Sequence, residues 1–220
     1  MSLVFPAPAP VTLPVAGGGS YPVHRIYCVG RNYAEHAQEM GFSGREPPFF
    51  FMKPNDALVP VAEGETGRIA YPSLTANLHH EVELVVALGP GGKIFGYALG
   101  LDMTRRDLQG EMKKQGRPWE IGKAFERSAP VGPVHPVSEV GHPDHGRITL
   151  KVNGELRQEG DLNQMIWKVP EMISYLSEFF ELAPGDVIMS GTPSGVGPVN
   201  RGDRMEIEVE GLGGMTVSVV

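Results

Sequence analysis

Short apolar runs, each closed by Gly, Pro or Asn-Gly, recur along the chain and predict a protein built mainly from strands. The expected strands cover residues 25–29, 49–52, 80–86, 95–101, 148–152, 155–157, 187–189, 205–209 and 215–220. Asn153-Gly154 lies between two of these runs and is typical of a type I′ turn, so residues 148–157 are expected to form a β-hairpin.

Helical signals are fewer, and three helices are expected. They cover residues 32–40, 104–115 and 169–181. Thr104 is a residue type that caps helices, and Asp107 three residues later completes the pattern of a capping box. Because helices and strands do not alternate regularly, the pattern favours an α+β fold, mostly β, with a large antiparallel or mixed sheet.

The first 20 residues are rich in Pro, Ala and Gly, which predicts an N-terminal arm ahead of a single domain over residues 21–220. Four prolines interrupt the apolar start, which argues against a signal peptide. No apolar run approaches the roughly 18 residues of a membrane-spanning helix. We therefore expect a cytoplasmic protein without a membrane partner. The Gly- and Pro-punctuated stretch that ends near Pro48 predicts a lid over about residues 31–48.

The charge balance is acidic, with 19 Lys and Arg against 26 Asp and Glu and a net charge of −7. Such a chain, without a long basic run, is a poor partner for a nucleic-acid backbone, where neutralised phosphates dominate the affinity. The single cysteine, Cys28, excludes an intrachain disulfide. Composition therefore directs attention to small-molecule chemistry.

Glu81 and Glu83 stand two residues apart on an expected strand, so both side chains leave the same face, with Cα atoms roughly 6.5–7 Å apart. The strand around them is mostly apolar, and buried carboxylates need a metal or cationic partners. Asp102 ends the next apolar strand and is the natural third ligand. Three carboxylates without a thiolate suit Mg²⁺ or Mn²⁺. The alternatives are a solvated strand face for the glutamates and an ordinary turn for Asp102.

Arg106 and Gln109 share one face of the second helix, and Lys123 follows in an apolar stretch. Together they could stabilise an oxyanion beside a metal. Each taken alone is an ordinary surface side chain.

His36 and Glu39 lie three residues apart on the helix expected to begin at Asn32. A His with a carboxylate on the same helix face is the minimal general-base pair. An exposed amphipathic helix is the alternative.

Two common catalytic motifs are absent. Residues 191–195 do not form a nucleophile elbow, because Pro193 spoils the helix that such an elbow begins. Residues 191–197 lack the Lys of a phosphate-binding loop. Neither serine hydrolysis nor nucleotide binding has support.

Taken together, these features resemble the fumarylacetoacetate hydrolase family, from Arg25 onward. The motifs that carry the resemblance lie at residues 29–36, 47–54, 79–84, 101–109, 151–160 and 191–197. Within the family, residues 25–28 and 116–123 are most similar to bacterial acylpyruvate hydrolases, including those that act on fumarylpyruvate in gentisate breakdown. One departure is the connection between Gly89 and Gly96, which is shorter than family members commonly carry.

The resemblance implies a mixed β-roll or sandwich with a few short helices, a homodimer, and one Mg²⁺ or Mn²⁺ per subunit. The implied site residues are the metal ligands Glu81, Glu83 and Asp102, the oxyanion residues Arg106, Gln109 and Lys123, the water-activating pair His36 and Glu39, and Thr192 for the substrate carboxylate.

The implied reaction is metal-dependent hydrolysis of a carbon–carbon bond in a 2,4-dioxo acid, with fumarylpyruvate and water giving fumarate and pyruvate. The distal carboxylate of that substrate needs a cation, for which Arg31, Arg45 and Lys53 are candidates. Oxaloacetate decarboxylation and isomerisation or tautomerisation of a 2-oxo-diene acid are the alternative reactions on the same scaffold. A catalytically silent binding module is the alternative of another class.

Overall fold

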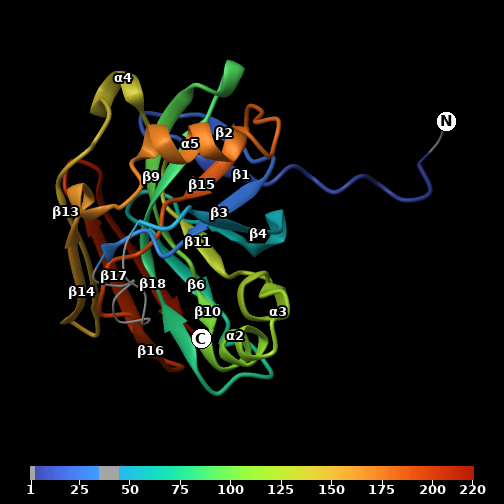
Figure 1. Ribbon diagram of the computed structural model, residues 1–220, viewed down its shortest axis with the longest axis vertical. Helices are drawn as coiled ribbons and strands as arrows, with labels where there is room; N and C mark the ends of the chain where they lie inside the picture. The colour runs from blue at the N-terminus through green and yellow to red at the C-terminus, as the bar shows by residue number, and fades with distance from the viewer. Residues whose placement is uncertain (1–2, 35–44) are drawn as a thin grey trace.

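The computed structural model of the protein describes residues 3–34 and 45–220, and strands account for most of its regular structure (Figure 1). The largest sheet has eight strands, in the order β4-β3-β15-β8-β9-β11-β5, with β12 beside β9. Its strands are β3 (Ile26–Gly30), β4 (Phe49–Lys53), β5 (Leu58–Pro60), β8 (Val82–Leu88), β9 (Ile94–Leu101), β11 (Ala129–Val131), β12 (His135–Pro136) and β15 (Val187–Met189). The sheet is mixed, because β15 runs parallel to β3 and antiparallel to β8. The predicted mostly-β α+β class is confirmed.

A five-stranded sheet covers one face of this large sheet, in the order β14-β13-β17-β18-β6. Its strands are β6 (Thr66–Ile69), β13 (Arg147–Val152), β14 (Glu155–Asp161), β17 (Arg204–Val209) and β18 (Gly213–Val219). Strict alternation along β17 buries Met205, Ile207 and Val209 and exposes Arg204 and Glu208, so one face packs on the core and the other meets water.

The hairpin predicted at Asn153-Gly154 is present between β13 and β14. Both turn residues have positive φ, 53° and 83°, as a type I′ turn requires.

Strand β8 lies at the centre of the large sheet and is buried along its whole length. Leu84 and Val86 pack on one side, in the cluster that includes the five-stranded sheet. Val85 and Ala87 pack on the other side with Leu13 of the N-terminal hairpin, which joins β1 (Thr12–Pro14) and β2 (Ser20–Pro22). Residues 3–10, before this hairpin, are exposed and run away from the body of the molecule (Figure 1), whereas the rest of the expected 20-residue arm includes the buried Leu13.

The strand expected over residues 80–86 is interrupted at Glu81. The residues before the break form β7 (Leu78–His80), which lies between β10 (Thr104–Arg105) and β16 (Gly197–Val199) in a separate three-stranded sheet. The residues after it form β8 of the large sheet. Glu81 therefore stands where the chain passes from one sheet to another.

The described residues contain four α-helices. They are α2 (Arg106–Lys114), α3 (Glu120–Lys123), α4 (Val137–Val140) and α5 (Val169–Ser177). None is long and apolar enough to cross a membrane. The first predicted helix lies mostly outside the described residues, α5 ends earlier than expected, and the single-turn helices α3 and α4 were not predicted.

The start of α2 differs from the prediction. Thr104 is in β10, and its hydroxyl donates to the carbonyl of Asp102 instead of capping the helix. Asp107 accepts hydrogen bonds from Thr75 and Ala76 and so ties α2 to the loop before β7. A capping box and a strand-to-helix junction place the same residue types at the same spacing. The sequence therefore predicted a helix cap at Thr104, where the structure has a strand.

The short connection after β8 closes tightly. A 3₁₀ turn, η2 (Pro90–Gly92), leads into β9, and the Gly89 amide donates to the carbonyl of Lys93 at 2.7 Å. Two further 3₁₀ turns, η1 (Asn55–Ala57) and η3 (Leu162–Gln164), join strands elsewhere.

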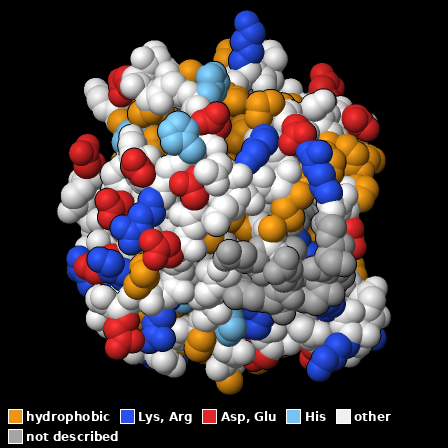
Figure 2. All heavy atoms as spheres, turned by 60° about the vertical axis from the view of Figure 1, so that its left-hand side comes forward, with side chains coloured by type: hydrophobic (Ala, Val, Ile, Leu, Met, Phe, Trp, Pro, Cys, Tyr) orange, Lys and Arg blue, Asp and Glu red, His pale blue; other side chains and the backbone are white. Residues whose placement is uncertain are grey.

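Charged side chains of both signs are interspersed over the face drawn in Figure 2.

Candidate active site

A cavity of about 390 Å³, including its open mouth, lies where the ends of β8 and β9 meet α2, α3 and the loop after β15. Among the described residues, fourteen line it, and eight of these were predicted as site residues: Arg31, Glu81, Glu83, Asp102, Arg106, Gln109, Lys123 and Thr192. Segments more than 150 residues apart in sequence thus meet at one place.

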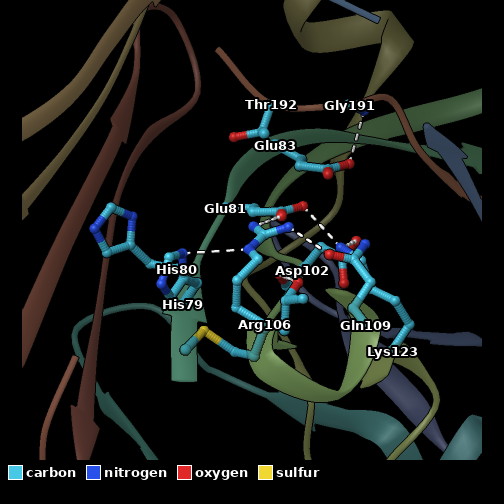
Figure 3. A network of polar contacts seen from close by, with 12 residues as sticks. His79, His80, Glu81, Glu83, Asp102, Arg106, Gln109, Lys123, Gly191 and Thr192 are labelled. Atoms are coloured by element: carbon cyan, nitrogen blue, oxygen red, sulfur yellow. Dashed lines mark hydrogen bonds and ion pairs between the residues drawn. The ribbon is translucent and has the colours of Figure 1, made fainter. Parts of the chain in front are cut away.

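The three predicted metal ligands converge at the inner end of this cavity (Figure 3). We call this end the floor; it consists of Glu81, Glu83, Asp102, Arg106 and Lys123. Ligand atoms of Glu81, Glu83 and Asp102 all lie within 4.8 Å of one another. The backbone fixes this convergence, because the Asp102 amide donates to the Glu81 carbonyl at 2.9 Å. The side chains are buried, and the donor set is oxygen only, which fits a hard divalent cation such as Mg²⁺ or Mn²⁺.

Glu83 is the carboxylate with the least cationic support. Burial, followed by the charges of Asp102 and Glu81, raises its pKa well above the usual value. Its Oε2 accepts a hydrogen bond from the Gly191 amide at 2.8 Å. A divalent cation would supply the positive charge that this end of the cluster needs.

Two cations hold the other two carboxylates. Lys123 Nζ lies 2.8 Å from Glu81 Oε2 and 2.6 Å from Asp102 Oδ2, and Arg106 donates to Glu81 Oε1. Burial acts to lower the pKa of Lys123, but the carboxylates of Asp102 and Glu81 outweigh it, so the pKa is raised and the ammonium stays charged.

The placement of Lys123 depends on close packing between two helices. A Cβ at Gly122 would come within 2.8 Å of the Gln109 backbone nitrogen, so only glycine lets α3 approach α2 this closely. A glycine immediately before a buried lysine is thus part of how the sequence builds the site.

The side-chain amide of Gln109 is held in one orientation by Arg106, whose guanidinium can only donate hydrogen bonds. Its Oε1 accepts from Arg106 Nη1 at 2.6 Å. The amide NH₂ group of Gln109 therefore remains to donate into the cavity. This is the geometry expected of an oxyanion donor.

Lys53, predicted as a substrate-binding cation, lies beneath the floor instead. Its Nζ is fully buried, 2.9 Å from Asp102 Oδ1 and 2.8 Å from Ser128 Oγ, and it also donates to the carbonyls of Met103 and Lys123. With these oxygens around it, the ammonium supports Asp102 and has no room for a substrate carboxylate.

Arg45, another candidate for binding the distal carboxylate of the substrate, is also not among the residues that line the cavity. It is exposed, pairs with Glu171 at 2.5 Å and stacks over Trp167. His36 and Glu39 lie outside the described residues.

The mouth of the cavity has an aromatic wall that sequence reasoning missed. The rings of Phe49 and Phe51 lie 5.2 and 6.1 Å from that of Trp119. Arg31 stacks over Phe49 at 5.2 Å, and burial lowers the pKa of its guanidinium. Alternation along β4 puts Phe49 and Phe51 on one face, a signal that was available in the sequence.

The chain is similar to several known proteins. A family model described as fumarylacetoacetate (FAA) hydrolase C-terminal matches residues 25–220. A crystal structure of fumarylpyruvate hydrolase from Pseudomonas aeruginosa, in complex with Mn²⁺ and pyruvate, is 57% identical, with a TM-score of 0.97 over 100% of this chain and 99% of that one. The mitochondrial oxaloacetate tautomerase FAHD1 of Homo sapiens is 45% identical over 88% of this chain and 90% of its own. The oxaloacetate tautomerase YcgM of Escherichia coli is 43% identical over 87% and 90%.

Proposed function

This chain belongs to the fumarylacetoacetate hydrolase family, and from that premise we propose that it hydrolyses a carbon–carbon bond of a 2,4-dioxo acid. The proposed substrate is fumarylpyruvate, which with water gives fumarate and pyruvate. The observation that carries the proposal is the convergence of three buried carboxylates beside paired cations in a cavity, in a chain 57% identical along its length to a fumarylpyruvate hydrolase.

The charges of the floor match this substrate class. When all three carboxylates are ionised, their charge is balanced by Lys123 and Arg106 in the floor and by Lys53 beneath it. A divalent cation would give this group of side chains a net positive charge, which attracts the carboxylate at the 2-oxo acid end of the substrate. When bound, Mg²⁺ or Mn²⁺ supplies a Lewis acid for the 2-oxo acid end of the substrate.

The residues of the chain then have separate parts in the reaction. Water adds to the C4 carbonyl, and the amide NH₂ of Gln109 and the cation of Arg106 stabilise the negative charge that develops on its oxygen. The bond between C3 and C4 breaks, its electron pair passes to the pyruvate fragment as an enolate, and protonation at C3 completes the reaction. Removal of the proton from water is assigned to His36, with Glu39 orienting its ring.

The mouth of the cavity suits the fumaryl group. A flat, unsaturated acyl chain can pack against Phe49, Phe51 and Trp119, and its distal carboxylate can pair with Arg31. A product panel tests this: the metal-stripped protein is reloaded with Mg²⁺ or Mn²⁺ and given fumarylpyruvate, maleylpyruvate, acetylpyruvate or oxaloacetate, with pyruvate and the released acid measured separately.

We expect fumarate and pyruvate in equal amounts from fumarylpyruvate, no turnover after chelation, and slower turnover of acetylpyruvate. Absence of fumarate formation by the metal-loaded protein would overturn the proposed reaction.

Oxaloacetate tautomerisation is the second candidate, because relatives named for that activity are 43–45% identical to the chain. It uses the same binding of a 2-oxo acid but needs no attacking water. His36→Ala should abolish hydrolysis and leave enol-to-keto conversion or decarboxylation of oxaloacetate largely intact. If hydrolysis survives this change, the assignment of His36 is wrong.

We also propose that the protein is a homodimer. Light scattering of the purified protein, which gives its molar mass in solution, tests this.

A further inference from the structure

A buried glutamine lies on a strand whose neighbouring side chains are exposed. Gln158 belongs to β14, at the edge of the five-stranded sheet, and is 0% exposed although Arg157 and Glu159 on either side meet solvent. Burying an amide without hydrogen bonds is costly, so its partners explain its presence.

Two backbone groups fix which way the Gln158 amide faces. Its Oε1 accepts from the Val82 amide at 3.1 Å, and its Nε2 donates to the Pro193 carbonyl at 2.9 Å. A backbone N–H can only donate and a carbonyl can only accept, so the amide cannot be reversed.

This orientation determines the hydrogen at the next contact. His80 Nδ1 lies 2.8 Å from Gln158 Oε1, which is an acceptor, so Nδ1 must carry a hydrogen. That conclusion holds whatever the state of Nε2. His80 is buried and does not line the cavity.

The same orientation determines the hydrogen on the other side. Gln158 Nε2 donates to Thr192 Oγ1 at 2.8 Å, so the threonine oxygen is an acceptor there and its own hydrogen must point elsewhere. Thr192 lines the cavity, beside Gly191 and the metal ligand that Gly191 holds (Figure 3). A free threonine hydroxyl can donate or accept as it rotates, whereas this one already accepts from Gln158, so its hydrogen is directed away from that contact.

We propose that Gln158, held by the backbone of Val82 and Pro193 and by the Nδ1 hydrogen of His80, commits the Thr192 hydroxyl to donating a hydrogen bond to the carboxylate of the bound 2-oxo acid, so that Gln158 and His80 are positioning residues. This inference rests on the proposed function for its substrate class. The relay runs from His80 through Gln158 to Thr192, and its first two members act on the substrate only through the third. A hydroxyl held as a donor favours an anion over a neutral analogue and needs no reorientation when the anion arrives.

A double-mutant cycle tests the relay, with pyruvate binding to the Mn²⁺-loaded protein measured by calorimetry. Thr192→Val removes the hydroxyl, and we expect it to weaken pyruvate binding about tenfold or more. Gln158→Glu presents oxygens that only accept, so the Thr192 hydroxyl should turn toward the carboxylate and binding should weaken similarly. Adding Gln158→Glu to Thr192→Val should then cost no more than a further twofold or so, because the hydroxyl it misdirects is gone. Additive losses in the double variant would overturn the relay.

A matched pair at position 80 gives a second measurement in case Gln158→Glu fails to fold. His80→Asn retains an N–H donor to Gln158 and should bind pyruvate within about threefold of the parent, whereas His80→Leu lacks the donor and should bind about tenfold more weakly. In turnover, the loss should appear in KM more than in kcat. Equal binding by His80→Asn and His80→Leu would overturn the relay.

The test is separable from the proposed reaction. If the unmodified protein binds pyruvate with these mutational effects but releases no fumarate from fumarylpyruvate, the relay stands and the proposed reaction fails. If fumarate is released but Thr192→Val binds pyruvate normally, the relay fails and the reaction stands.

Discussion

The floor and the mouth of the cavity are built in opposite ways. The floor (Glu81, Glu83, Asp102, Arg106 and Lys123) consists of largely buried charges whose oxygens and nitrogens contact one another. The mouth consists of one arginine and three partly exposed rings (Arg31, Phe49, Phe51 and Trp119), joined by a cation–π contact and by edge-to-face and tilted ring contacts. A change in the floor leaves a buried charge without a partner, whereas a change at the mouth removes a contact that water can replace. Chemistry and acyl specificity are thus carried by separate regions.

The largest expected effect follows from Asp102→Asn in the floor. This change removes a ligand and leaves Lys53 and Lys123 with one anionic partner fewer. We expect a loss of kcat/KM of at least about 10³-fold and loss of metal binding by calorimetry. Asp107→Asn, in the first turn of α2 and bound to Thr75 and Ala76, is the control and should retain metal binding. Normal metal affinity in Asp102→Asn would contradict the assignment of the floor.

The next effect concerns the support beneath the floor. Lys53→Met keeps an unbranched side chain only one atom shorter but removes the buried ammonium that contacts Asp102 and Ser128. Breaking a buried pair of this kind lowers the free energy of unfolding by about 3–5 kcal/mol. Denaturant melts measure it, and Arg204→Ala, which breaks an exposed pair with Glu206, should cost less than about 1 kcal/mol. Equal losses of unfolding free energy in the two variants would contradict the expectation that the buried ion pair stabilises this molecule more than the exposed one.

Changes at the mouth should be selective for the substrate. Arg31→Gln removes the cation assigned to the distal carboxylate, and we expect kcat/KM for fumarylpyruvate to fall about 10- to 100-fold. Acetylpyruvate lacks that carboxylate and should be turned over within about threefold of the parent rate. If kcat/KM falls equally for both substrates, Arg31 acts on a part that the two substrates share and not on the distal carboxylate. If kcat/KM falls for neither, Arg31 has no part in the site.

The smallest effect is a proton linkage at Glu83. Burial and the neighbouring carboxylates raise its pKa, so below that raised pKa a cation must displace a proton to bind. Metal affinity should rise with pH, by up to about tenfold per pH unit, and level off above the raised pKa. By the same linkage, the metal-free protein gains stability from the Glu83 proton at low pH and loses that contribution as pH rises through the raised pKa. Calorimetry in buffers of different ionisation enthalpy measures the released proton, and pH-independent affinity would contradict the linkage.

The sequence predicted the floor better than its surroundings. Glu81, Glu83 and Asp102 were found because carboxylates at the ends of apolar strands have few stable explanations, and the family motifs around them are specific. Lys53 was predicted as one of three candidate cations for the distal carboxylate of the substrate, and nothing in its local sequence indicates that it is buried. Its burial depends on Ser128 and on carbonyls contributed by distant segments, which no local pattern encodes.

The misreading of Thr104 has a similar cause. Residue type and spacing are alike for a helix cap and for a two-residue strand that leads into a helix, and tertiary pairing with β7 decides between them. The part played by Gln158 had no sequence signal, because a lone glutamine on an alternating strand is typical of a solvated face.

The interruption at Glu81 has a mechanical consequence. Glu81 is the last residue before the chain enters the large sheet, while Glu83 and Asp102 belong to that sheet and its immediate exit. An ion bound by all three carboxylates would therefore connect the three-stranded sheet that ends at His80 to the eight-stranded sheet. Loss of the ion would weaken the junction between these two sheets, where His80 also lies.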